Sequence, residues 1–144
     1  MFKHILVPVD LAHAERLHKA LAIAAEMARL HSAPVTYLAI AEETPGPVGH
    51  NPNEFREHLE AFARGEGDKH GIETRAHMIV STDPAVEINR SIRNAVKELG
   101  ADLVVMASHA PTVMDWILPS HAGNVAEHSE ASVFVVRLAP NGPI

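Results

Sequence analysis

The chain has 144 residues, of which 47% are hydrophobic, and this matches one ordinary globular domain with a sizeable core. Its 18 acidic and 12 basic residues give a formal net charge of -6 without a Lys/Arg cluster, so we expect no nucleic-acid partner. Because the chain contains no cysteine, disulfides, thiolate nucleophiles and Cys-based zinc sites are excluded, and a reducing cytosol is suitable.

The N-terminal residues MFKHILVPVD do not form a signal-peptide pattern, and they pass directly into a strand-like run. The longest apolar runs, such as ALAIAA at 20–25, are far shorter than the ~20 residues of a membrane span. We therefore expect a cytoplasmic protein without membrane insertion. The 11 histidines show neither H-x-E-x-H nor HExxH spacing, so most of them are expected at the solvated surface.

The first expected strand covers Phe2–Val9, an apolar, β-branched run that closes on Asp10. Apolar residues then recur at helical spacing from about Ala14 to His31. A Ser-Ala-Pro break follows, and Val35–Ile40 is expected as the second strand. The helix between these two strands predicts a parallel crossover.

The segment Glu42–Asn53 carries three Pro and two Gly in its twelve residues, which predicts an exposed loop that could act as a lid. A helix face follows at 55–62, and glycines at 65, 67 and 71 are expected to loosen its end. Ile72–Val80 is expected as the third strand. Asp83 and Pro84 then predict a helix start, the first as N-cap and the second at the first helical position.

Gly100 is expected to end that helix, and Ala101–Ser108 is the fourth expected strand. The last helix should begin after Ser120, which would act as its N-cap, and Ser132–Leu138 should form a fifth strand at a sheet edge. Residues 1–139 would then form one domain, with 140–144 as a flexible tail.

This alternation predicts an α/β fold with a single doubly wound, five-stranded parallel sheet and four flanking helices, which is Rossmann-like. In such sheets, ligands bind at the carboxyl ends of the strands, where the strand order reverses. The loops at 9–13 and 107–121 follow the first and fourth strands. We therefore expect these two loops to form the binding site.

Four segments carry a shared pattern: ILVPVD at 5–10, ADLVVMASH at 101–109, LPSHAGNVAEH at 118–128 and SVFVVR at 132–137. Together they resemble the universal stress protein family, and the resemblance covers nearly the whole chain. It implies an adenine nucleotide alpha hydrolase-like sheet, a homodimer, and a cleft in which many members bind ATP.

The resemblance implies adenine and ribose contacts at the first two strand ends, with Asp10 accepting hydrogen bonds. It implies phosphate contacts after the fourth strand and at the start of the last helix. The implied cofactor-binding residues are Pro8, Val9, Asp10, Ala39, Ile40, Met106, Ala107, Ser108, His109, Ala110, Ser120, His121 and Ala122.

The phosphate motif of ATP-binding members is Gly, two residues, Gly, nine residues, then Gly-Ser or Gly-Thr. Its glycine positions here are Ala107, Ala110 and Pro119, with only eight residues between the last two. Alanine adds a methyl group where a phosphate would approach, and proline has no N–H to donate. Two flanking histidines can replace some donors when they are protonated. We therefore expect a degenerate cleft that binds ATP or AMP weakly.

The segment ASHAP at 107–111 resembles a branch of the family that has ASH-x-P after the fourth strand and the same shorter spacing. Members of that branch keep Gly-Ser at the later position, so Pro119 departs from both patterns. A charge-assisted phosphate hydrogen bond contributes ~1.5–3 kcal/mol, so losing one or two would weaken binding about tenfold to several thousandfold.

Other interpretations of these residues are open. Asp10 can cap the turn at 12–14 instead of contacting a ligand. His109 and His121, with Asp10 and His13 near them, could bind a metal, but they lack i, i+4 spacing and we predict no metal site. The apolar cluster around Trp116 is better explained by packing than by partner docking.

Catalytic motifs such as G-x-S-x-G and G-x-x-x-x-G-K-[ST] do not occur, so we do not expect an enzyme. The leading hypothesis is a stress-response module that dimerises through Ser132–Leu138 and has a degenerate ATP/AMP cleft. The alternative is a nucleotide-independent regulatory protein that docks a partner, such as a transporter or another stress protein. A small hydrolase using His109 and Asp10 is the least favoured reading.

Overall fold

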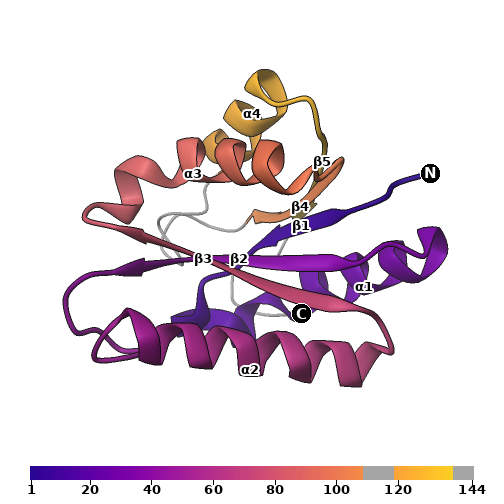
Figure 1. Ribbon diagram of the computed structural model, residues 1–144. Coiled ribbons are helices and arrows are strands. Elements are labelled where there is room, and N and C mark those ends of the chain that lie inside the picture. Colours follow the sequence, from indigo (N-terminus) through magenta and orange to yellow (C-terminus); the bar gives the residue numbers. More distant parts are fainter. Residues whose placement is uncertain (109–118, 138–144) are drawn as a thin grey trace.

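The structure is a computed structural model, and it describes residues 1–108 and 119–137. Strands alternate with helices along the chain (Figure 1). The strands are β1 (Ile5–Pro8), β2 (Val35–Glu42), β3 (Thr74–Ser81), β4 (Leu103–Ser108) and β5 (Ser132–Arg137). The helices are the 3-10 helix η1 (Leu11–Leu17), then α1 (His18–His31), α2 (Pro52–His70), α3 (Pro84–Leu99) and α4 (Pro119–His128).

The strands form one sheet in the order β3-β2-β1-β4-β5, and every neighbouring pair is parallel. The helices α1 and α2 lie on one face, and α3 and α4 lie on the other (Figure 1). The predicted doubly wound parallel sheet is therefore confirmed, with β5 at an edge. Because the chain proceeds from β1 to β2 on one side and later to β4 on the other, the strand order reverses between β1 and β4.

Each face of the sheet packs a separate hydrophobic core. The core under α1 and α2 includes Ile5, Val7, Tyr37 and Leu59, all 2% exposed or less. The core under α3 and α4 includes Leu6, Leu38, Ile88 and Ile92. Consecutive β1 residues thus enter opposite cores, which explains why this strand reads as an unbroken apolar run.

The predicted boundaries of α3 are confirmed. The Asp83 carboxylate accepts a hydrogen bond from the Val86 N–H at 3.4 Å, and Gly100 ends the helix with φ of 69°. Both features satisfy backbone groups that have no partner within the helix. Across the described ranges, none of the helices combines the length and the apolar character that crossing a membrane requires.

The helix α2 is longer than predicted. Asn51 caps it by accepting a hydrogen bond from the Glu54 N–H at 3.0 Å, so it begins at Pro52, inside the expected loop. It continues through Gly65 and Gly67, which were expected to loosen its end. A Cβ at Gly67 would lie 2.7 Å from the Thr74 hydroxyl, so this glycine permits close packing of α2 on β3.

Two other helix predictions are wrong in detail. The helix expected from about Ala14 consists of η1 and α1, because His13 has non-helical backbone angles inside η1. The last helix begins at Pro119, so Ser120 lies in the first turn and is not the N-cap. Proline is favoured at the first helical position because the N–H that it lacks has no helical partner. Trp116 and the predicted tail at 140–144 lie outside the described residues.

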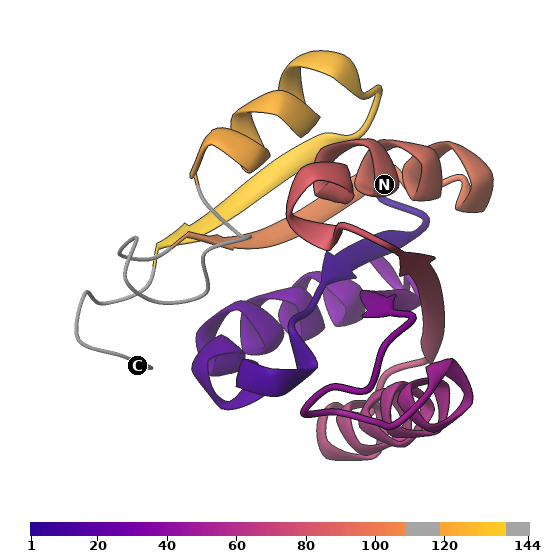
Figure 2. The ribbon, with the colours of Figure 1, turned by 90° about the vertical axis from the view of Figure 1, so that its left-hand side faces the viewer.

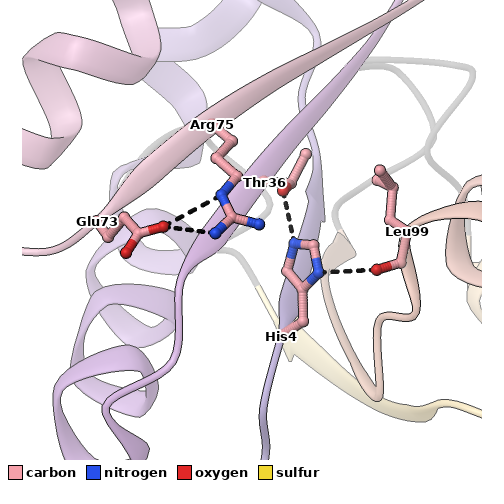
Figure 3. Close-up of polar contacts among 5 residues, drawn as sticks. All are labelled: His4, Thr36, Glu73, Arg75 and Leu99. Atoms are coloured by element: carbon pink, nitrogen blue, oxygen red, sulfur yellow. Dashed lines mark hydrogen bonds and ion pairs between the residues drawn. The ribbon is translucent and has the colours of Figure 1, made fainter.

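A buried histidine joins the amino ends of the strands (Figure 3). His4 lies 2.6 Å from the Thr36 hydroxyl through Nε2 and 3.1 Å from the Leu99 carbonyl oxygen through Nδ1. Since a carbonyl can only accept, Nδ1 carries the hydrogen, and Nε2 of the neutral ring accepts from the hydroxyl. The Asp102 carboxylate accepts hydrogen bonds from the N–H groups of Lys3 and His4. These contacts link β1 to β2 and to the turn between α3 and β4.

Truncation of a core residue on α3 should destabilise the fold. Ile92 is fully buried, whereas Val86 on the same helix is 75% exposed. We expect Ile92→Ala to lower the free energy of unfolding by about 2–5 kcal/mol, because it leaves a cavity. The control Val86→Ala should change it by no more than about 0.5 kcal/mol. Urea denaturation measures both, and equal effects would contradict this assignment of the core.

A buried tyrosine should make the fold sensitive to alkali. The Tyr37 hydroxyl has no hydrogen-bond partner among the described residues, and burial, with a smaller contribution from the Glu66 charge, raises the pKa of Tyr37. Above pH ~10 the unfolded chain would release this proton while the folded chain keeps it, so stability falls. We expect Tyr37→Phe to lose less stability than the wild type between about pH 9 and 11 in urea titrations. Equal losses would show that Tyr37 does not contribute.

Candidate functional site

A cavity of about 550 Å³ opens at the carboxyl ends of β1 and β2. Figure 2 looks toward these strand ends. The walls come from four parts of the chain: the turn after β1, the end of β2 with its following loop, α2 and the start of α3. The lining residues are Val9, Asp10, Leu11, Ala12, Ile40, Glu42, Thr44, Pro45, Gly46, Pro47, Val48, Gly49, Asn51, Phe55, Asp83 and Pro84.

The loop between β2 and α2 forms one wall of the cavity. It is closed by a hydrogen bond from the Gly46 N–H to the Gly49 carbonyl at 3.0 Å. A Cβ at Gly49 would lie 2.9 Å from the Phe55 nitrogen, so a larger residue there would displace the loop. The proline and glycine residues of this segment therefore set the shape of the cavity wall, and the lid role predicted for it stays a prediction.

Asp10 leaves the end of β1 and reaches the cavity. Its carboxylate caps η1 by accepting a hydrogen bond from the Ala12 N–H at 3.1 Å, and it contacts His13 Nδ1 at 2.9 Å. The side chain is 15% exposed. Asp10 therefore acts as the cap that the sequence offered as the alternative to ligand contact, and it also lines the cavity. Within the ranges that the structure describes, no group of three or more His, Asp or Glu side chains is placed to hold a metal ion.

The other predicted site residues fall into three groups. Val9 and Ile40 line the cavity with Asp10. Pro8, Ala39, Met106 and Ala107 are buried in β1, β2 and β4, Ser108 is buried at the end of β4, and none of these five lines the cavity. The backbone of Ser120, His121 and Ala122 belongs to the first turn of α4, and His109 and Ala110 lie outside the described residues. The phosphate half of the predicted site is therefore still a prediction.

Two acidic residues of the cavity, Glu42 and Asp83, were not identified from the sequence as site residues. Asp83 was identified only as a helix cap, although its position before α3 also brings it to the cavity. With Asp10 they give three carboxylates, and no Lys, Arg or His is among the described residues that line the cavity. Carboxylates accept hydrogen bonds, so this cavity suits hydroxyl and amino groups better than anionic groups.

Two basic residues near the ends of β4 and β5 were likewise not identified from the sequence as site residues. The Arg137 Nη1 donates a hydrogen bond to the Ser108 hydroxyl at 3.1 Å, and Lys19 Nζ donates to the Arg137 carbonyl at 3.1 Å. Arg137 is part of the SVFVVR segment, but its pairing with Ser108 depends on the register of β4 and β5. Arg137 therefore lies at the end of β5, which β4 separates from β1 and the acidic cavity, and the Lys19 ammonium group contacts this strand end.

Comparison with known proteins agrees with this geometry. The family model described as the universal stress protein family matches residues 1–137. The chain is 30% identical over 149 residues to universal stress protein G of Salmonella typhimurium, with 95% of this chain and 100% of that protein covered.

Solved structures show the same fold. A universal stress protein from Archaeoglobus fulgidus has a TM-score of 0.66 and 25% identity, with 94% of this chain and 93% of that chain covered. The universal stress protein from Archaeoglobus fulgidus in complex with dAMP has a TM-score of 0.64 and 24% identity, with 92% and 96% covered. With the family match spanning nearly all residues, this chain belongs to the universal stress protein family.

Proposed function

We propose that this protein is a stress-response module that binds adenine nucleotides, weakly in the case of ATP, in the cavity at the ends of β1 and β2. The cavity itself is the observation that carries this proposal. Its volume of about 550 Å³ lies within the range of small-molecule sites, and its walls are largely apolar. A similar structure that contains dAMP supports the same ligand class.

The lining suggests how a nucleoside would bind. The side chains of Val9, Ile40 and Phe55 offer apolar surface to a base. The carboxylates of Asp10 and Asp83 can accept hydrogen bonds from ribose hydroxyls or an exocyclic amine. Both carboxylates already cap helices, so their positions are fixed before a ligand arrives.

The weakness toward ATP is part of the proposal and rests on Pro119. This residue holds the first position of α4, where an N–H would otherwise face an anion at the helix start. Ala107 and Ala110 replace two glycines of the phosphate motif. Each change removes a donor or adds a methyl group where a phosphate would approach.

We propose a binding module and not an enzyme, and we place it in the cytoplasm, which the cysteine-free composition suits. A homodimer through β5 is part of the proposal. This edge strand exposes Phe134 and Val135, at 40% and 37%. An exposed apolar edge favours pairing with a second copy. The same surface would serve the alternative function, in which the protein docks a different partner.

Restoring the phosphate motif should tighten ATP binding. We expect the wild type to bind ATP weakly or not at all in calorimetric titrations, and Pro119→Gly with Ala107→Gly to improve the affinity about tenfold or more. The control Pro119→Ala restores the N–H without the freedom of glycine, so it separates the two effects. Tight ATP binding by the unmodified chain would contradict the proposed loss.

A charge on β5 should break the dimer. We expect Val135→Lys to convert the dimer to a monomer in sedimentation experiments, because a desolvated charge opposes strand pairing. The matched control is Val80→Lys on β3, the other edge strand, where the valine is 41% exposed. If Val135→Lys leaves the dimer intact and Val80→Lys breaks it, the interface lies at β3.

A further inference from the structure

We propose that Arg137, together with Lys19, forms a phosphate subsite that takes the terminal phosphates of a nucleoside di- or triphosphate. This inference rests on the proposed function, because the nucleoside part of the ligand would occupy the cavity at β1 and β2. It assigns the phosphate contact to side chains that lie outside the degenerate phosphate motif.

Local contacts fix the position of Arg137. It is the last residue of β5, and in the parallel register it lies beside Ser108, the last residue of β4. Figure 2 shows these two strand ends side by side. The hydrogen bond from Arg137 Nη1 to the Ser108 hydroxyl holds the guanidinium group over the end of β4. Among the described residues, Ser108 is the one partner found for the guanidinium, so its remaining N–H groups can donate to a ligand.

Lys19 adds a second positive charge at the same place. It lies in the first turn of α1, and its Nζ donates a hydrogen bond to the carbonyl of Arg137 at 3.1 Å. Among the described residues, no carboxylate forms an ion pair with Arg137 or with Lys19. Two basic side chains near the end of β5 that have no carboxylate partner among the described residues favour the binding of an anion.

The distribution of charge matches the two ends of a nucleotide. The cavity at β1 and β2 has three carboxylates among its lining residues, which would repel phosphates and accept hydrogen bonds from a nucleoside. The charged side chains at the carboxyl end of β5, Arg137 and Lys19, are positive instead. A nucleotide with its nucleoside in the cavity therefore gains from directing its phosphates across β4 toward Arg137.

The spacing of the strands fits a polyphosphate. In the order β1-β4-β5, Asp10 follows β1 and Arg137 ends β5, and these two strands are two positions apart. Neighbouring strands are ~4.8 Å apart, so this separation is roughly 10 Å. That span is comparable to the extended phosphate chain of ATP and exceeds the single phosphate of AMP. The subsite therefore predicts a contribution of Arg137 to ATP binding that is larger than its contribution to AMP binding.

The test is a pair of titrations, with ATP and with adenosine, on the wild type and on Arg137→Gln. We expect the variant to bind ATP about tenfold more weakly, because a charge-assisted hydrogen bond is lost, and to bind adenosine as the wild type does. Lys19→Gln should act in the same direction with a smaller effect. The matched control is Arg75→Gln on β3, since this exposed arginine pairs only with Glu73 among the described residues.

Each outcome is decisive. Unchanged adenosine binding and an unchanged sedimentation profile would show that Arg137→Gln is folded and assembled as the wild type is. If ATP binding is also unchanged, if ATP and adenosine weaken equally, or if the wild type binds adenosine but no ATP at millimolar concentration, the subsite is wrong while the proposed function stands. If the wild type binds neither ATP nor adenosine at millimolar concentration, the proposed function fails and this inference fails with it.

Discussion

The burial of β1 on both faces is the constraint on which the site depends. Because Ile5 and Val7 enter one core and Leu6 enters the other, β1 must lie inside the sheet, between β2 and β4. The chain continues from β1 to β2 on one side, and β4 and β5 lie on the other side, so the strand order reverses beside β1. The cavity at the carboxyl ends of β1 and β2 lies next to this point of reversal.

Charge then divides this edge of the sheet into two parts. Asp10 and Asp83 are held at the cavity by their capping bonds, so these two acidic positions have a structural cause. Arg137 lies at the end of β5, which β4 separates from β1, and Lys19 of α1 contacts the Arg137 carbonyl. An arrangement of this kind orients a dipolar ligand such as a nucleotide without a full set of backbone donors. In the proposed binding mode, side-chain cations compensate in part for a phosphate motif that has lost its glycines.

Much of the fold was predictable because its signals are local. The apolar run of β1 predicts a buried strand, Asp83 predicts the start of α3, and Gly100 predicts its end. Each signal depends only on neighbouring residues, and all three predictions are confirmed. The start of α2 was missed because Asn51 sits inside a Pro- and Gly-rich segment that reads as loop. The acidic cavity and the Arg137 contact were missed for a different reason. Both depend on contacts between segments that are far apart in the sequence and come together at the strand ends. No local sequence pattern indicates which segments will be neighbours.

The central claim is that a nucleotide lies across the strand ends, with its nucleoside in the acidic cavity and its phosphates toward β5. A crystal structure of the protein with a non-hydrolysable ATP analogue tests this most directly. The account predicts the base against Val9 and Ile40, a ribose hydroxyl bonded to the Asp10 carboxylate, and the terminal phosphate in contact with the Arg137 guanidinium. Phosphates bound inside the cavity, beside Glu42 and Asp83, would contradict it.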